Sequence, residues 1–290
     1  MFDTVVIVDW SANARPKHGA DSIWIAQVDV ASGDTQLLAN PGTRVEARHL
    51  LVDLLVHAGP TLVGFDFPFG YPAGFASAAG LTGNTPWRAV WRHLADSIVD
   101  DDRNRNNRWE VAAELNRRLG TQWFWGAPRS RSGANLTATK PAFDAPPHEY
   151  RVVEQRLRDE QRRPFSCRQL LGVGSVGSQA ITGIPVLEHL RAHRALDARV
   201  RVWPFEPLDL PSPDRIVLAE VWPSYLPNAQ IADVDHPIKD AQQVVALARH
   251  LAAQQRNGEL DALLARALAP HLHPHTAAEV VREEGWVLLV

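Results

Sequence analysis

The first part of the chain carries apolar patterns that predict three short β-strands. Residues 5–8 are consecutive aliphatic side chains, which is typical of a strand buried on both faces. Residues 22–30 alternate between apolar and polar side chains and end at a turn-forming Ala-Ser-Gly-Asp sequence, so they predict a second strand. Residues 35–38 predict a short third strand. Taken in order, these segments predict an antiparallel meander.

A helix and another buried strand are expected next. Apolar side chains recur at helical spacing between residues 43 and 58, and Thr43 with Glu46 matches a capping box at the start of that helix. A Gly-Pro pair then ends it. Residues 61–67 carry a nearly continuous apolar run, so they predict a fourth strand that resembles the first.

Beyond this strand the chain becomes irregular. From about residue 70 to 198, helical patterns alternate with Gly- and Pro-rich loops, which predicts a mainly helical insertion. Its helical segments are expected near residues 86–99, 108–119, 148–161 and 184–196. The segments that follow predict two strands and then two helices, at residues 199–203, 215–222, 238–255 and 259–268. Residues 285–290 predict either a last strand or a docked tail.

This order of elements defines the fold class that we expect. Three antiparallel strands, a helix, a further strand, an insertion, more strand and a C-terminal helix match a ribonuclease H-like α/β domain with a mixed sheet. A doubly wound fold is hard to reconcile with this order, because it needs a helix between its early parallel strands. We therefore predict one ribonuclease H-like domain over residues 1–290, with its helical insertion at about 70–198.

Composition narrows the setting. The chain has 290 residues, of which 45% are hydrophobic and 22% charged, as in ordinary globular proteins. Its apolar runs are all shorter than the roughly 20 residues that span a bilayer, so we expect no membrane association. Cys167 is the single cysteine, which rules out an internal disulfide and favours a reducing, cytoplasmic location. The net charge of −3 gives no overall basic signal for nucleic acid. Nothing here indicates an oligomeric state.

Four acidic residues fall where elements of this fold begin or end. Asp9 ends the first strand, Asp66 lies at the end of the fourth, Glu220 lies near the end of a later strand, and Asp240 opens the C-terminal helix. Such positions can converge on one edge of a sheet. Carboxylates that meet there repel one another unless a cation lies between them, and their oxygens suit Mg²⁺ or Mn²⁺. We therefore predict that these four residues form a catalytic metal site.

The chemistry of such a site is phosphodiester hydrolysis, in which one ion activates water and a second stabilises the leaving oxygen. Each acid alone also has a simpler explanation. An Asp after a strand is common in turns, and Asp240 can stabilise the start of a helix by facing its dipole. The pairing of Asp9 with Asp66, both after apolar runs, is what favours the metal site.

Basic and hydroxyl residues supply candidate substrate contacts. The segment from residue 87 to 131 mixes tryptophans with arginines, a combination that grips single-stranded nucleic acid in other proteins. Equally, those tryptophans can pack between helices while the arginines coat the outside. Within a loop of this segment, Arg129 and Arg131 are the best local phosphate binders. Ser11 and Lys239 stand beside the predicted acids and complete the expected substrate site.

Four motifs resemble a known family. The sequences VDWSAN, GFDFPFGYP, EVWPS and HPIKDA are similar to those of an uncharacterised bacterial family described as predicted nucleases with a ribonuclease H fold. Some members are labelled as cobalamin or molybdopterin biosynthesis proteins. The resemblance covers most of the chain and implies that Asp9, Asp66, Glu220 and Asp240 form the site. The chain lacks the acid three residues after Asp240 that Holliday-junction resolvases carry.

We therefore expect a metal-dependent nuclease or phosphodiesterase that acts on nucleic acid or a nucleotide. Two other functions fit the same element order. A nucleotide-dependent phosphotransferase of the actin and sugar-kinase type shares the strand order, and residues 9–11 can imitate its phosphate loop. A binding module without catalysis would keep the fold and lack metal affinity. Binding of ATP would favour the first, and absence of metal affinity the second.

Overall fold

The computed structural model describes residues 2–290 except 143–146, 173–174, 209–213, 267–271 and 273. Its centre is a mixed six-stranded sheet with the order β3-β2-β1-β4-β6-β5. The strands are β1 (Thr4–Asp9), β2 (Trp24–Asp29), β3 (Thr35–Ala39), β4 (Thr61–Phe65), β5 (Val200–Val202) and β6 (Ile216–Glu220). The expected α/β class, with antiparallel strands followed by parallel ones, is confirmed.

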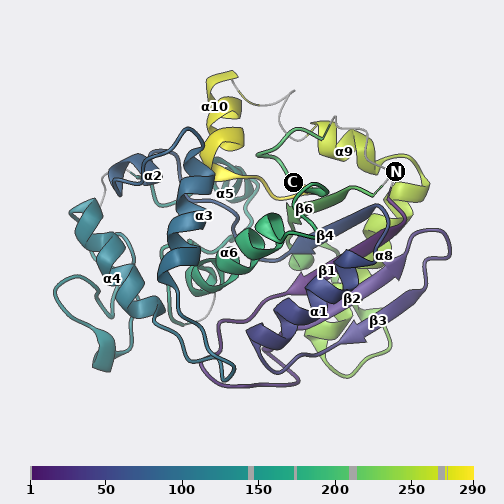
Figure 1. Ribbon diagram of the computed structural model, residues 1–290, viewed down its shortest axis with the longest axis horizontal. Helices are drawn as coiled ribbons and strands as arrows, with labels where there is room; N and C mark the ends of the chain where they lie inside the picture. Colours follow the sequence, from purple (N-terminus) through teal and green to yellow (C-terminus); the bar gives the residue numbers. More distant parts are fainter. Residues whose placement is uncertain (1, 143–146, 173–174, 209–213, 267–271, 273) are drawn as a thin grey trace.

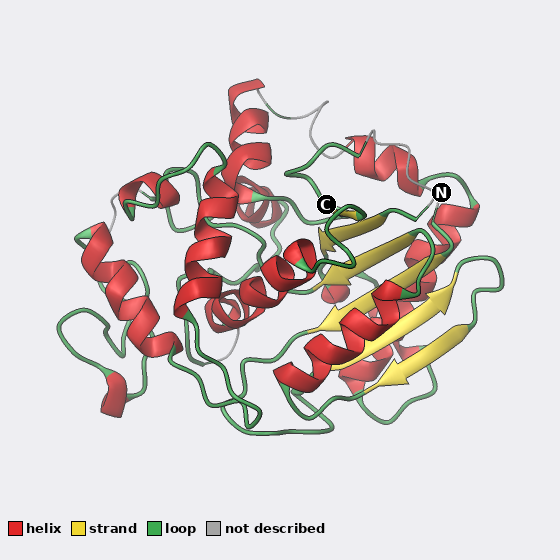
Figure 2. Cartoon of the chain, viewed as in Figure 1, coloured by secondary structure: helices red, strands yellow, loops and turns green. Residues whose placement is uncertain are grey.

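Strand pairing follows the expected order. β1 pairs antiparallel with β2, and β2 pairs antiparallel with β3. On its other side β1 pairs in parallel with β4, where Val8 lies opposite Phe65. β4 then pairs in parallel with β6, and Phe65 lies opposite Glu220. The ends of β1, β4 and β6 therefore meet at one edge of the sheet, which faces the helical part of the molecule (Figure 2).

Helices cover both faces of the sheet. Helix α1 (Arg44–Val56) starts at the predicted capping box, since the Thr43 side chain accepts the Glu46 N–H and the Glu46 carboxylate accepts the Thr43 N–H. It packs with the Val6 and Val8 side of β1. Helix α8 (Lys239–Arg256) packs on the opposite face with Val5 and Ile7, which alternate with the other pair along the strand.

The predicted insertion is mainly helical and lies beside the sheet (Figure 1). Its helices are α2 (Phe75–Ala78), α3 (Pro86–Ser97), α4 (Arg108–Leu119), the short 3₁₀ helix η1 (Arg129–Arg131), α5 (Val152–Asp159) and α6 (Val176–Ala192). After β6 follow η2 (Pro223–Tyr225), α7 (Asn228–Ala232), α8, α9 (Leu260–Arg266), α10 (Pro274–Glu279) and the π-helical turn η3 (Val280–Glu284). Among the described residues, none of these helices combines the length and apolar character that crossing a membrane requires.

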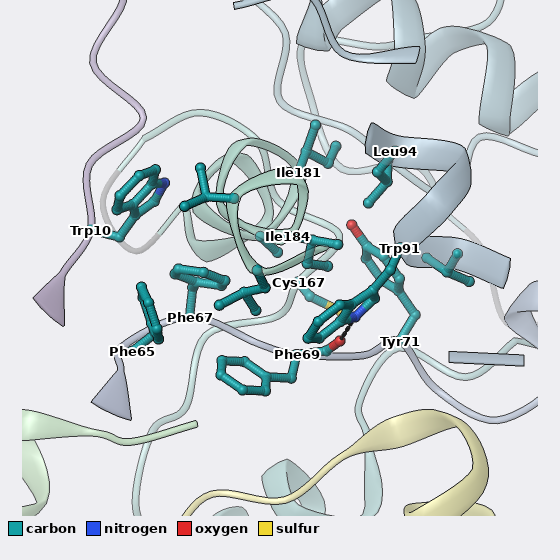
Figure 3. Close-up of a cluster of buried hydrophobic side chains, with 14 of the residues drawn as sticks. Trp10, Phe65, Phe67, Phe69, Tyr71, Trp91, Leu94, Cys167, Ile181 and Ile184 are labelled. Carbon is teal, nitrogen blue, oxygen red and sulfur yellow. Dashed lines mark hydrogen bonds between the residues drawn. The ribbon is translucent and has the colours of Figure 1, made fainter. Parts of the chain in front are cut away.

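Aromatic side chains join the sheet to the insertion. Phe65, Phe67 and Phe69 follow one another with ring centroids 5.6 and 5.9 Å apart, and Phe69 meets Trp91 of α3 edge-on at 5.8 Å. The Trp91 indole N–H donates to the Phe69 carbonyl at 2.6 Å (Figure 3). Trp91, Phe67 and Phe69 are essentially inaccessible to water. One continuous core therefore fixes the chain just beyond Asp66.

One expectation needs correction, and for residues 285–290 the structure decides between the two predicted alternatives. Helix α6 spans Val176–Ala192, so it begins before the predicted start at residue 184 and ends before the predicted end at 196. Its first turns bury the small residues Gly177, Ser178 and Ala180, which give no pattern of large apolar side chains at helical spacing. The segment 285–290 forms no regular strand and makes an isolated bridge between Val287 and Glu220. It is a docked tail, with Trp286 fully buried.

Candidate active site

Asp9 and Asp66 lie side by side at the edge of the sheet. β1 and β4 are parallel neighbours in register, so the residues that follow Val8 and Phe65 leave the sheet together. The Asp66 N–H donates to the Val8 carbonyl at 3.3 Å, and the Trp10 N–H donates to Asp66 Oδ1 at 2.7 Å. Hydrogen bonds thus join the two segments at the two acids. The adjacent position of Asp9 and Asp66 agrees with the sequence prediction.

Electrostatics at this pair favour protonation. Burial raises the pKa of Asp9 well above its ordinary value, and the carboxylates of Asp66, Asp240 and Asp21 raise it further. Burial also raises the pKa of Asp66 to about 7, although hydrogen bonds from Trp10 and with Asp9 oppose that change. The strongest charges acting on Asp9 are therefore other carboxylates. Buried acids that face only acids hold protons until a cation replaces them.

Asp240 adds a third acid to the cluster, since its charge acts on both Asp9 and Asp66. It is the second residue of α8, and its Oδ2 accepts the Asp21 N–H at 2.6 Å. Asp21 has a left-handed backbone with φ of 52°, a conformation that costs energy for a residue other than glycine. The Asp21 carbonyl accepts hydrogen bonds from the Ser11 hydroxyl and the Asn13 amide. The loop before β2 therefore carries a fourth acid to this site.

Arg44 holds the loop that follows Asp9. Its guanidinium is buried and donates to the carbonyls of Ser11 and Asn13 at 3.1 and 2.8 Å. The same side chain forms an ion pair with Asp100 of the insertion. As the first residue of α1, Arg44 thus ties the loop, the helix and the insertion together. A charged donor of this kind fixes several carbonyls at once.

Helix α6 forms another wall of the site. Gln179 Nε2 donates to the Trp10 carbonyl at 2.6 Å, and the Trp10 indole N–H donates to the Thr182 hydroxyl at 3.3 Å. A Cβ at Gly177 would lie only 2.3 Å from the Cys167 carbonyl oxygen, so this glycine allows the close approach of the first turn. Gly177 is the last residue of a GxGxxG sequence at 172–177, of which residues 173 and 174 lie outside the described part.

These elements enclose a cleft of about 590 Å³. Its lining includes acids, polar groups of the loop after β1 and of α6, and several apolar side chains. Its acidic and basic lining residues are Asp9, Asp21, Asp240 and Arg108. Two apolar side chains at the cleft, Phe165 and Leu171, are 47% and 45% exposed. A cleft of this size suits a small organic ligand.

Glu220 stands near the acids but is occupied by another partner. Arg151 donates to both of its carboxylate oxygens, at 2.7 and 2.6 Å, and the Phe69 N–H donates to Oε2 at 3.0 Å. Arg151 also binds the buried Glu154. Burial opposes the charged guanidinium, yet Glu154 and Glu220 raise the pKa of Arg151 well above its ordinary value. Glu220 is thus neutralised in an ion pair rather than free for a metal.

Of the four residues predicted to bind substrate, one lines the cleft and three do not. Ser11 lines the cleft. Lys239 is exposed at the start of α8 and does not line the cleft, although its neighbour Asp240 does. Arg129 and Arg131 lie exposed in η1 and are also absent from the lining, and Arg131 pairs with Glu110. The structure therefore brings Ser11 to the acids and leaves both η1 arginines elsewhere.

The donor set partly fits a divalent cation. Adjacent Asp9 and Asp66 supply hard oxygen ligands at a buried spot with excess negative charge. Asp240 acts on both of them electrostatically, while its Oδ2 is engaged by Asp21. Within the described ranges, no group of three or more His, Cys, Asp or Glu side chains is already arranged around one metal position. A cation at Asp9 and Asp66 would thus need a further carboxylate to turn toward it.

Sequence reasoning missed Asp21 and Arg108 as parts of the site. Asp21 lies in a loop between two strands, and only its hydrogen bond to Asp240 shows its place. Arg108 belongs to a segment that is rich in arginines, so its type and spacing do not distinguish it from its neighbours. Both residues reach the site only because segments far apart in the sequence pack together, which local sequence patterns do not predict.

Comparison of the chain with protein-family models, with curated proteins and with solved structures gives no match.

Proposed function

We propose that this protein is a metal-dependent phosphodiesterase of the nuclease type. The observation that supports this proposal best is the half-buried pair of Asp9 and Asp66, whose strongest charged neighbours are also carboxylates. Mg²⁺ or Mn²⁺ would be held by Asp9 and Asp66, with Asp240 or Asp21 as a further ligand. Glu220 is left out of this set because Arg151 occupies both of its oxygens.

The strand order supports a ribonuclease H-like fold for the proposal. Three antiparallel strands lead into a helix and a parallel strand, and the acids follow the two central parallel strands. In such a sheet, ligands bind beyond the carboxyl ends of the parallel strands. Asp9 and Asp66 stand at that edge, and Asp240 reaches it from the start of α8.

In the proposed reaction, residues of this chain would bind the metal ion, hold the acids in place and contact the substrate. A bound divalent ion supplies charge neutralisation at the phosphate and lowers the pKa of water. Asp9 and Asp66 must lose their shared proton before they can bind it. The Trp10 N–H and Arg44 hold the acids and the adjoining loop in place. Ser11 and Gln179 line the cleft as neutral polar groups for the substrate.

The test is a calorimetric titration with Mn²⁺ at pH 8 of the wild type, Asp9→Asn and Asp53→Asn. Asp53 is an exposed acid on α1 and serves as the matched control. We expect saturable binding by the wild type and the control, and loss of that binding in Asp9→Asn. Hydrolysis of bis(p-nitrophenyl) phosphate should depend on Mn²⁺ and fail in Asp9→Asn. Equal, weak heats from all three proteins would refute the metal site.

The phosphotransferase alternative is less well supported. The loop after β1, residues 10–14, does line the cleft, but it contains no glycine that would bring its backbone close to phosphates. Titration with ATP in the presence of Mg²⁺ separates the two functions. Tight ATP binding without phosphodiester hydrolysis would favour the phosphotransferase.

A further inference from the structure

Arg108 is a buried cation at the acidic cleft. It is the first residue of α4, is 7% exposed, and lines the cleft together with Asp9 and Asp240. Its guanidinium carbon lies 4.3 Å from the centre of the Trp109 ring, and Nη1 donates to Asn106 Oδ1 at 3.0 Å. Its Nε is buried without an acceptor among the described residues. Trp109 and Asn106 therefore hold the Arg108 side chain in place, while its Nε lacks a hydrogen-bond acceptor among the described residues.

A guanidinium in this state is suited to an incoming anion. Burial and the charge of the nearby Arg44 lower the pKa of Arg108 to about 10, although Asp100 and Glu110 oppose this change, and the group stays charged at neutral pH. Across the described part of the chain it forms no ion pair of its own, whereas Arg44 is paired with Asp100. Phosphate oxygens match the planar fork of a guanidinium well.

The other arginines of the insertion do not build a track for a nucleic acid backbone. Between residues 87 and 131, six of the eight other arginines form ion pairs with acids of the insertion, namely Arg88 and Arg92 with Glu188, Arg105 with Asp101, Arg117 and Arg118 with Glu114, and Arg131 with Glu110. Four of the five tryptophans between residues 87 and 131 are buried, since Trp87, Trp91, Trp109 and Trp123 are at most 9% exposed, and Trp125 is half-buried. Long nucleic acids need many phosphate contacts and open aromatic surfaces.

The apolar side of the cleft offers a surface for a small ring. Only three large hydrophobic side chains are strongly exposed among the described residues, and two of them, Phe165 and Leu171, line this cleft. Phe165 can stack on a planar base, a contact that every nucleobase allows. The cleft volume of about 590 Å³ fits a ligand of one or two nucleotides.

We propose that Arg108 binds a terminal phosphate of a small, nucleotide-sized phosphodiester in this cleft. The inference rests on the proposed function, because that function places the bond to be hydrolysed near Asp9 and Asp66. It assigns the anchoring charge to Arg108 rather than to Arg129 or Arg131. It also assigns the substrate to short nucleotides rather than to long nucleic acid.

The test compares two probes, thymidine dinucleotide with and without a 5′-phosphate, in titrations with and without Mn²⁺. The proteins are the wild type, Arg108→Met, Arg108→Lys and the control Arg103→Met. Arg103 is also an arginine and lies in the loop just before α4, but it is exposed and does not line the cleft. Thermal unfolding and Mn²⁺ affinity of each variant show whether folding and the metal site are intact.

We expect the 5′-phosphate to tighten binding to the wild type by about 10- to 100-fold, the range of a hydrogen bond between charged groups. This gain should vanish in Arg108→Met, shrink in Arg108→Lys, and persist in Arg103→Met. A gain that survives in both Arg108 variants, or is absent from the wild type, would overturn the inference. A 20-nucleotide strand that binds far more tightly than the dinucleotide would overturn the small-substrate assignment.

The inference and the proposed function fail in different ways. If the wild type binds no Mn²⁺ but the phosphate gain depends on Arg108 in metal-free protein, the metal site is wrong and the phosphate site stands. If Mn²⁺ binds normally and the phosphate gain is independent of Arg108, the metal site stands and the anchor is wrong.

Discussion

The backbone N–H of Trp10 donates to Asp66 Oδ1 at 2.7 Å, so the residue after one buried acid holds the side chain of the other. This bond exists because β1 and β4 are parallel neighbours in register. It keeps Asp66 facing Asp9 even though their like charges repel when both are ionised. The protein therefore maintains an acid pair whose proton occupancy depends on pH.

Replacing Asp66 by Asn should stabilise the metal-free protein, and more so at high pH. The folded pKa of Asp66 is raised from 3.8 to about 7, so between these values the folded state binds more protons than the unfolded state. Stability from this group is then lost as the pH rises, at up to about 1.4 kcal/mol per pH unit. We expect Asp66→Asn to gain about 2 kcal/mol more at pH 8 than at pH 5. Urea unfolding in EDTA measures this.

Asp53→Asn is the control for that experiment, because Asp53 is exposed on α1. Its effect should be small and similar at both pH values. A gain in Asp66→Asn that does not change between pH 5 and pH 8 would show that the Asp66 carboxyl is not held protonated in the fold.

Mn²⁺ affinity should rise between pH 6 and pH 8. The raised pKa values of Asp9 and Asp66 mean that binding must release protons in this range. One released proton corresponds to about a tenfold gain in affinity per pH unit. Calorimetry in buffers of different ionisation enthalpy counts these protons directly. Affinity that is flat over this range would contradict the assignment of the ion to this pair.

Arg151→Met should destabilise the fold strongly. The change leaves Glu220 and Glu154 buried without their cation, and breaking one partner of a buried ion pair costs about 3–5 kcal/mol. The double variant Arg151→Met with Glu220→Gln should recover part of this loss, since it removes one unpaired charge. The free energy of unfolding in urea measures all three proteins.

The control for this ion pair is the exposed one between Arg131 and Glu110. Arg131→Met should cost less than about 1 kcal/mol, because exposed ion pairs contribute little. If Arg151→Met were equally mild, the buried ion pairs would not stabilise strand β6, which carries Glu220.

Gly177→Ala should destabilise the protein and disturb the cleft. The added Cβ would lie 2.3 Å from the Cys167 carbonyl oxygen, so α6 must shift, at a cost of about 1–3 kcal/mol. Because Ser175, Ser178 and Gln179 line the cleft, dinucleotide binding should weaken as well. Gly133→Ala is the control, since no atom lies within 4 Å of its added Cβ. Equal unfolding temperatures of the two variants would contradict this packing.

Local patterns predicted much of the framework. Apolar runs predicted β1 and β4, alternation predicted β2, and the Thr43–Glu46 spacing predicted the start of α1. These features are set by neighbouring residues, because strand and helix periodicity bring nearby side chains to one face. The positions of Asp9 and Asp66 at adjacent strand ends followed from the same patterns once the strands were ordered.

Only the tertiary structure decided which charged groups meet. Arg151 lies 69 residues from Glu220, and Asp21 lies 219 residues from Asp240. No local periodicity relates residues at such distances, because their partners depend on how the insertion and α8 pack against the sheet. By itself the sequence therefore determined the elements and placed two acids at strand ends, whereas packing decided that Glu220 is paired with Arg151 and that Arg108 faces the acidic cleft.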